Sequence, residues 1–76
     1  MNESDKELRK ILASNIRGIR LERGMSQEQL ANVCELHRTY IGSVERSERN
    51  ITLSTLVKLA NALNVSAIEL LTQKEF

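Results

Sequence analysis

Residues 25–46, M-S-Q-E-Q-L-A-N-V-C-E-L-H-R-T-Y-I-G-S-V-E-R, decide the fold class of this chain. Ser26 followed by Gln29 has the spacing of a capping box, in which each side chain satisfies a free backbone N–H at a helix start. This spacing predicts a short helix from Gln27 to Cys34. Three residues later a second short helix is expected from Arg38 to about Arg46. Two short helices with this separation are typical of a helix-turn-helix.

Cap signals on either side of this stretch predict three further helices. Their N-terminal caps are Ser or Thr, whose hydroxyl oxygens accept hydrogen bonds from free backbone N–H groups. These caps are Ser4, Thr52 and Ser66, with Glu7 and Glu69 completing capping boxes for the first and the last. Gly24 and Asn64 end the first and fourth helices, which are expected over about residues 5–23 and 53–63. The fifth helix is expected to have about two turns.

Apolar residues at helical spacing predict which side of each helix faces the core. The residues expected to point inward are Leu8, Ile11, Leu12, Ile16, Ile19, Leu30, Val33, Cys34, Ile41, Val44, Leu53, Leu56, Val57, Ala60 and Leu63. The chain has no proline and only three glycines, fewer than strand-and-turn folds usually need. We therefore expect an all-α fold, a compact five-helix domain that spans residues 1–76.

A chain of 76 residues forms one domain, and folding at this size buries only about 60% of the unfolded surface. A disulfide cannot add stability because Cys34 is the only cysteine, and Cys34 with His37 supplies too few ligands for structural zinc. No metal or cofactor is expected, which leaves a partner chain as the source of extra stability. The lone thiol, with no signal peptide and no membrane span, indicates a cytoplasmic protein.

The net charge of +1 taken alone argues weakly against a nucleic-acid partner. The charge is unevenly distributed, however, because residues 9–23 carry +4 and residues 37–58 carry +2, and acidic residues elsewhere offset them. A DNA-binding protein needs a local basic face rather than a high total charge. The distribution is therefore compatible with a DNA-binding surface built from these two segments.

The second helix of a helix-turn-helix lies in the major groove, with its N-terminal residues at the base edges. Ile41 and Val44 are expected to point inward. The other face carries no bulky apolar group; it consists of Arg38, Thr39, Gly42, Ser43 and Arg46. Glycine costs roughly 1 kcal/mol relative to alanine inside a helix, so Gly42 suggests a close approach to something, for which the groove floor is one candidate.

The stretch 25–53 resembles the lambda-repressor-like, or Xre-type, helix-turn-helix domains. The most recognisable parts are Ser-Gln-Glu at 26–28 and I-x-x-V-E-R at 41–46, and the run L-A-N-A-L-N-V-S at 59–66 matches the junction of the last two helices. The resemblance covers about residues 8–72. Within this family, the run 37–51 is most similar to controller proteins of restriction–modification systems.

The resemblance implies a role for individual positions. Arg38 and Thr39 match positions that read base edges, and an arginine pairs its forked donors with O6 and N7 of guanine. The positions that match or are candidates for contacts with the DNA backbone are Gln27, Tyr40, Ser43, Arg49, Asn50, Arg46 and Arg17. The matching glutamine also braces the second helix of the motif, and the alternative for Tyr40 is that it covers the edge of the core. Arg20 and Glu45 match a buried ion pair. His37 is expected to be a cap or rim residue, and Cys34 a buried thiol.

The last helix is too apolar for the surface of a monomer, since its apolar residues cannot all face one core. We therefore expect a homodimer, with a helix-turn-helix at about 27–46 and a dimerisation region at about 53–76. The residues expected at the interface are Val65, Ile68, Leu70, Leu71 and Phe76. Dimers of this kind bind two half-sites about 34–36 Å apart.

Enzyme activity is not expected, because the chain has no Gly-rich phosphate loop and Cys34 with His37 lacks an orienting third group. The expected function is sequence-specific binding of duplex DNA by a homodimeric regulator. The resemblance implies a controller protein that regulates its own gene and the endonuclease gene, with no small-molecule effector evident. A contact with RNA polymerase through Glu28 or Glu35 is left open. The alternatives are a phage- or plasmid-type repressor and an antitoxin-like protein-interaction module.

Overall fold

The computed structural model describes the backbone of residues 3–76 and the side chains of residues 5–76. Within this range the chain forms five helices and no strand, which confirms the all-α fold. The helices are α1 (Glu3–Glu22), α2 (Gln27–Cys34), α3 (Arg38–Glu45), α4 (Leu53–Leu63) and α5 (Ala67–Leu70). None of these helices has an apolar segment long enough to span a lipid bilayer.

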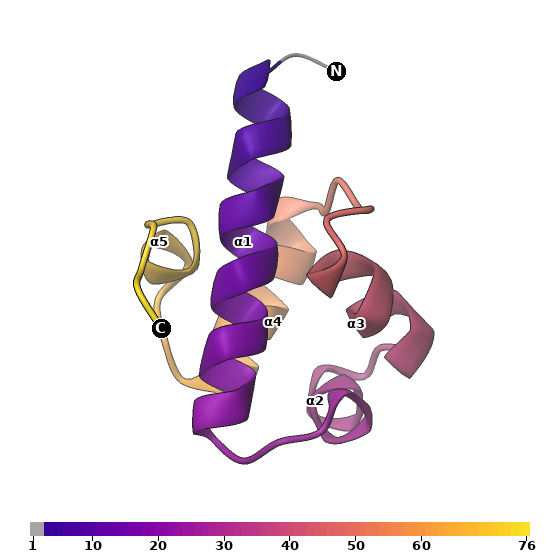
Figure 1. The fold of residues 1–76 in the computed structure, drawn as a ribbon. Coiled ribbons are helices and arrows are strands. Elements are labelled where there is room, and N and C mark those ends of the chain that lie inside the picture. The colour runs from indigo at the N-terminus through magenta and orange to yellow at the C-terminus, as the bar shows by residue number, and fades with distance from the viewer. Residues whose placement is uncertain (1–2) are drawn as a thin grey trace.

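Helix α1 is the central element of the fold. It packs against α3, α4 and α5, while α2 packs against α3 and α4. In Figure 1, α2 and α3 lie on one side of α1, and α5 with the C-terminus lies on the opposite side. Helix α1 therefore separates α5 and the C-terminus from the helix-turn-helix, whereas α4, the other part of the expected dimerisation region, packs against α2.

The helix bounds agree with the cap signals except at the two ends of the chain. Helix α1 begins at Glu3, two residues before the expected start, and the expected Ser4–Glu7 capping box lies outside the described side chains. Helix α5 has four residues instead of about two turns. Ser66 caps it as predicted, but the Glu69 carboxylate accepts a 2.9 Å hydrogen bond from Lys74.

One apolar core receives side chains from all five helices. Its fully buried members are Ile16, Ile19, Leu30, Ile41, Leu59, Leu63 and Leu70. Four residues that were expected to point inward are exposed instead: Leu8 (43%), Val33 (60%), Leu53 (79%) and Val57 (48%). In α4, the buried stripe of Leu56, Leu59, Ala60 and Leu63 already fills the core side, so Leu53 and Val57 fall on the adjacent face.

Candidate nucleic-acid interface

The helix-turn-helix is held together by its own caps. Ser26 Oγ accepts a 3.0 Å hydrogen bond from the Gln29 N–H, and the Gln29 side chain accepts a 2.7 Å bond from the Ser26 N–H. Glu35 ends α2 in the left-handed conformation (φ 59°). His37 Nδ1 then accepts a 3.1 Å bond from the Thr39 N–H at the start of α3, which confirms its role as a cap. Local sequence therefore determines where α2 stops and α3 starts.

A buried ion pair attaches α3 to α1. Arg20 Nε and Nη2 donate hydrogen bonds of 2.7 and 3.0 Å to the two carboxylate oxygens of Glu45, and Arg20 Nη1 donates to the Met25 carbonyl at 2.8 Å. The two side chains are only 9% and 4% exposed. The hydrogen bonds that Arg20 donates to Glu45 raise the pKa of Arg20. The pair implied by the family resemblance is thus present, and Gln27 Nε2 adds a 3.1 Å hydrogen bond to Glu45.

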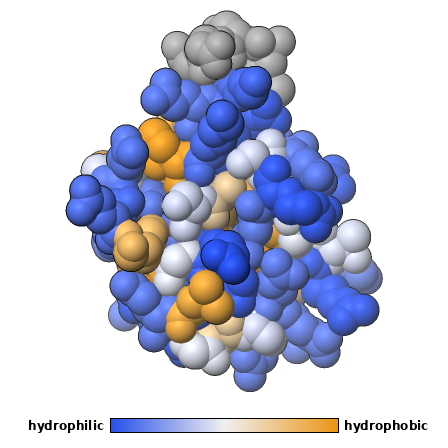
Figure 2. Space-filling view, viewed as in Figure 1, coloured by the Kyte–Doolittle hydropathy of each residue, from blue (hydrophilic) through white to orange (hydrophobic). Residues whose placement is uncertain are grey.

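The first turn of α3 presents Arg38 and Thr39 to solvent. Arg38 Nη1 lies 3.5 Å from Glu28 Oε2, and the two side chains are 69% and 65% exposed. An exposed pair of this kind is worth at most about 1 kcal/mol, so Arg38 can exchange Glu28 for another acceptor. The side of the molecule that carries α2 and α3 is mainly hydrophilic (Figure 2).

Ser43 was expected to contact the DNA backbone, but its side chain is buried and bonds groups of its own chain instead. It is 5% exposed, and its hydroxyl donates to the Tyr40 carbonyl at 2.7 Å. The same oxygen accepts a 2.9 Å hydrogen bond from Arg49 Nε. The Arg49 guanidinium lies over the Tyr40 ring, 5.2 Å from its centroid. Ser43 therefore connects the loop that follows α3 to the helix itself. Its hydroxyl bonds both the exposed Arg49 of that loop and the half-buried Tyr40 of α3.

Gly42 is covered by side chains of its own chain. A Cβ atom at this position would lie 3.1 Å from Arg46 Nη1 and 3.6 Å from Gln27 Oε1. The space expected for a close approach to DNA is therefore already occupied. Arg46 also donates two hydrogen bonds to Glu48, at 3.1 and 3.2 Å, which raise the pKa of Arg46 and lower the pKa of Glu48.

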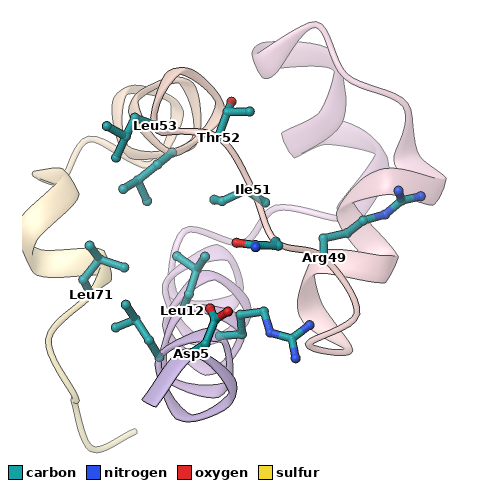
Figure 3. Close-up of a pocket in the computed structure, with 11 residues that line it drawn as sticks. Asp5, Leu12, Arg49, Ile51, Thr52, Leu53 and Leu71 are labelled. Carbon is teal, nitrogen blue, oxygen red and sulfur yellow. The ribbon is translucent and has the colours of Figure 1, made fainter. Parts of the chain in front are cut away.

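Two of the candidate residues lie away from the first turn of α3. Arg17 is exposed on α1 and shares a shallow depression with Gly18 and the C-terminal Phe76. Asn50 lines a hollow of about 140 Å³ between α1 and the start of α4. Figure 3 shows this hollow, with Arg49 directed away from it. Their assignment to DNA stays a prediction.

The expected dimer surface divides into exposed and buried residues. Ile68 is 78% exposed and Phe76 is 58% exposed, whereas Val65 and Leu71 are partly buried against the core. Leu70 is 0% exposed. Its expected place at an interface is wrong, because a side chain enclosed by its own chain has no surface to offer a partner.

Two residues that sequence reasoning placed in the core extend this apolar surface. Leu53 lies with Leu8 and Leu71 around the hollow shown in Figure 3, and Val57 follows Leu53 by one turn of α4. Their sequence positions could have revealed this exposure. Leu53 and Val57 are four residues apart, so they share a face of α4 that lies beside the stripe formed by Leu56 and its buried neighbours.

Residues 16–70 match a family profile described as Helix-turn-helix. The chain belongs to this helix-turn-helix family. The control protein C.SmaI of Serratia marcescens is 59% identical over 68 residues, which cover 90% of this chain and 81% of that protein. This helix-turn-helix protein is thus similar to a control protein over most of its length.

Two solved structures resemble this helix-turn-helix protein in fold as well as in sequence. The hypothetical transcription factor NHTF from Neisseria superposes with a TM-score of 0.85 at 48% identity, covering 91% of this chain and 80% of that one. The restriction–modification controller protein C.Esp1396I, solved as a tetramer with its natural 35 base-pair operator, superposes with a TM-score of 0.76 at 41% identity, covering 83% of each chain. The family consists of DNA-binding transcription regulators and not of enzymes.

Proposed function

We propose that this protein is a homodimeric regulator of transcription that reads duplex DNA with α3 and controls a restriction–modification system, regulating its own gene and the endonuclease gene. The observation that carries this proposal is the presentation of Arg38 and Thr39 in the exposed first turn of α3. That helix is fixed to α1 by the buried pair of Arg20 and Glu45, so the two reading side chains project from a rigid support.

In the proposed complex, α3 lies in the major groove and α2 crosses the phosphate backbone. Arg38 leaves Glu28 and donates two hydrogen bonds to a guanine, worth about 1–3 kcal/mol of discrimination between bases. The methyl group of Thr39 packs against a thymine methyl group. The side chains proposed for the DNA backbone are Gln27, Tyr40, Arg46, Arg49, Asn50 and Arg17.

The proposed partner is a second copy of this chain. A monomer would leave the apolar side chains of Leu53 and Ile68 in contact with water, and the half-buried Leu71 shares a hollow with Leu53. The tetramer of C.Esp1396I on its operator supports an oligomer as the DNA-bound form. A regulator that works on operator DNA acts in the cytoplasm of a bacterial cell. Glu28 and Glu35 are both exposed, and both stay candidates for a contact with RNA polymerase, because Arg38 releases Glu28 when it binds DNA in the proposed complex.

A gel-shift titration at several salt concentrations tests the proposal, using an operator selected from random-sequence duplexes by the wild-type protein. The affinity is expected to fall steeply with salt, since each phosphate contact releases counterions. Arg38→Ala is expected to bind the operator roughly 5- to 150-fold more weakly and to lose preference at one base pair. Lys10→Ala is the matched control, because Lys10 is exposed on α1 beside Gln73 and Lys74. Equal binding by the two variants would overturn the assignment of Arg38.

A further inference from the structure

The short helix α5 is attached to α1 through one buried amide. Asn15 is 1% exposed, and its Nδ2 atom donates hydrogen bonds to the carbonyls of Leu70 and Thr72, both at 2.8 Å. The Glu69 carbonyl lies 3.4 Å from the same nitrogen. The Leu70 carbonyl ends α5 and the Thr72 carbonyl lies two residues beyond it, where backbone acceptors have no partner within the helix. Asn15 therefore caps α5 from an element about 55 residues earlier in the chain.

The residues after α5 continue along the same face of α1. Gly18, one turn after Asn15, lies under the ring of Phe76, and a Cβ atom at Gly18 would come within 2.6 Å of three ring atoms. A helix of four residues is too short to hold an orientation by itself. The burial of Leu70 and the hydrogen bonds from Asn15 supply the orientation, and they leave Ile68 78% exposed.

We propose that Asn15 is the positioning residue of the dimer surface. It holds α5 on α1 so that Leu71 lies at the same hollow as Leu53 of α4 and Ile68 stays exposed. This inference rests on the proposed function, because it takes a second copy of the chain as the partner of that surface.

The position of Asn15 also relates the dimer surface to the DNA-reading helix. Arg20, which holds α3 through Glu45, follows Asn15 by five residues on the same helix. Five residues of α-helix span about 7.5 Å, and this segment has no proline that would bend it. Because α1 carries both attachments, Asn15 sets the angle between the dimer surface and α3. That angle determines the separation of the two reading helices.

The variant Asn15→Ala tests this role. It leaves the carbonyls of Leu70 and Thr72 without a donor, and we expect the dimer dissociation constant in sedimentation to rise roughly tenfold or more. Binding to a duplex with both half-sites is expected to weaken by a similar factor. Binding to the same duplex cut to one half-site is expected to stay within about twofold, because Arg20 and Glu45 still hold α3.

Two further variants separate positioning from general stability. Ser14→Ala is the matched control on α1, because Ser14 is exposed next to Asn15 and its loss leaves the attachment of α5 in place, so the dimer constant should stay within about threefold. Asn15→Asp places a carboxylate against the same carbonyls, so it is expected to weaken the dimer more at pH 8 than at pH 5, where a protonated carboxyl can donate. If Asn15→Ala does not fold, Asn15→Ser, which keeps one donor, serves for the same comparison.

The outcomes distinguish this inference from the proposed function. A wild-type protein that sediments as a monomer, or that selects no DNA sequence, would overturn the proposed function. The role of Asn15 alone would be overturned if the wild type is a dimer and Asn15→Ala has the same dimer dissociation constant and the same affinity for the operator. An equal loss of binding to the half-site and to the full operator would also overturn it, since it would indicate damage to the whole fold.

Discussion

The helix-turn-helix of α2 and α3 and the C-terminal region from α5 to Phe76 are stabilised in different ways. In α2 and α3, the caps are Ser26 with Gln29 and His37 with Thr39, each within three residues of its partner. In the C-terminal region, Ser66 supplies a local cap, but the end of α5 is held by Asn15 from α1. One region is defined mainly by neighbours in sequence and the other mainly by a neighbour in space.

This difference agrees with the proposal that α3 reads DNA and that the C-terminal region binds a second chain. A helix that reads bases must keep its position to within about 0.5 Å. The position of α3 is held by local caps and by the buried Arg20–Glu45 pair. The C-terminal region leaves large apolar side chains such as Ile68 exposed. In the proposed dimer, a second chain covers these side chains.

The largest effect is expected from breaking the buried ion pair that attaches α3 to α1. Glu45→Ala leaves the Arg20 guanidinium buried without its carboxylate, and removing one member of a buried pair costs about 3–5 kcal/mol. The free energy of unfolding from urea titration measures this cost. Glu48→Ala is the control, because the exposed pair of Arg46 and Glu48 is expected to change stability little. Similar losses in the two variants would contradict the role of the buried pair.

The next effect separates two neighbouring residues of the C-terminal region. Leu70→Ala empties a fully buried site and is expected to cost about 2–5 kcal/mol of unfolding free energy. Ile68→Ala, at a side chain that is 78% exposed, is expected to change monomer stability by less than about 0.5 kcal/mol and to weaken the dimer in sedimentation. A large loss of stability for Ile68→Ala and a small one for Leu70→Ala would mean that α5 buries Ile68 in place of Leu70.

A smaller effect compares the two serine caps directly. Ser26→Ala removes a complete capping box, and a lost N-cap costs typically about 1 kcal/mol. Ser66→Ala is expected to cost less, because Leu70 and Asn15 continue to hold α5. Thermal melts of both variants, followed by circular dichroism, give the order. A larger loss for Ser66→Ala would mean that α5 depends on its local cap after all.

The smallest effect concerns Cys34, which packs α2 against α4 without contributing a strong polar bond. Burial raises the pKa of the Cys34 thiol above its ordinary value. The native state therefore favours the protonated thiol, and this contribution to stability is present below the ordinary thiol pKa and is lost as the pH rises through the raised pKa. Alkylation at pH 8 is expected to be much slower for the native protein than for the protein in urea, as mass spectrometry would show. Equal rates would place Cys34 at the surface.

Much of the fold was predictable because most of its caps are local. The bounds of α2 and α4 followed from Ser26, Gln29, Thr52 and Asn64, whose partners lie within a few residues. The identity of the core residues was less predictable. Helical periodicity finds the stripe that faces inward, but it does not say how wide that stripe is, and Val33, Leu53 and Val57 were wrongly included.

The candidate site divided in the same way. The exposure of Arg38 and Thr39 follows from their place at the start of α3, and it was expected from sequence. Ser43 and Gly42 sit on the same helix but are covered by Arg49, Arg46 and Gln27, which come from the following loop and from α2. Sequence spacing does not reveal such coverage, because it depends on where long flexible side chains settle.

The sequence by itself determined the five helices, the helix-turn-helix and the presentation of Arg38, because hydrogen bonds between close neighbours decide where helices start and stop. Only the tertiary structure decided that Leu70 is core while Ile68 is surface, and that Asn15 holds the end of α5. The physical reason is that burial and long-range hydrogen bonds depend on which elements meet in space. A polar residue such as Asn15 on an amphipathic helix gives no sign in the sequence of the carbonyls it will meet.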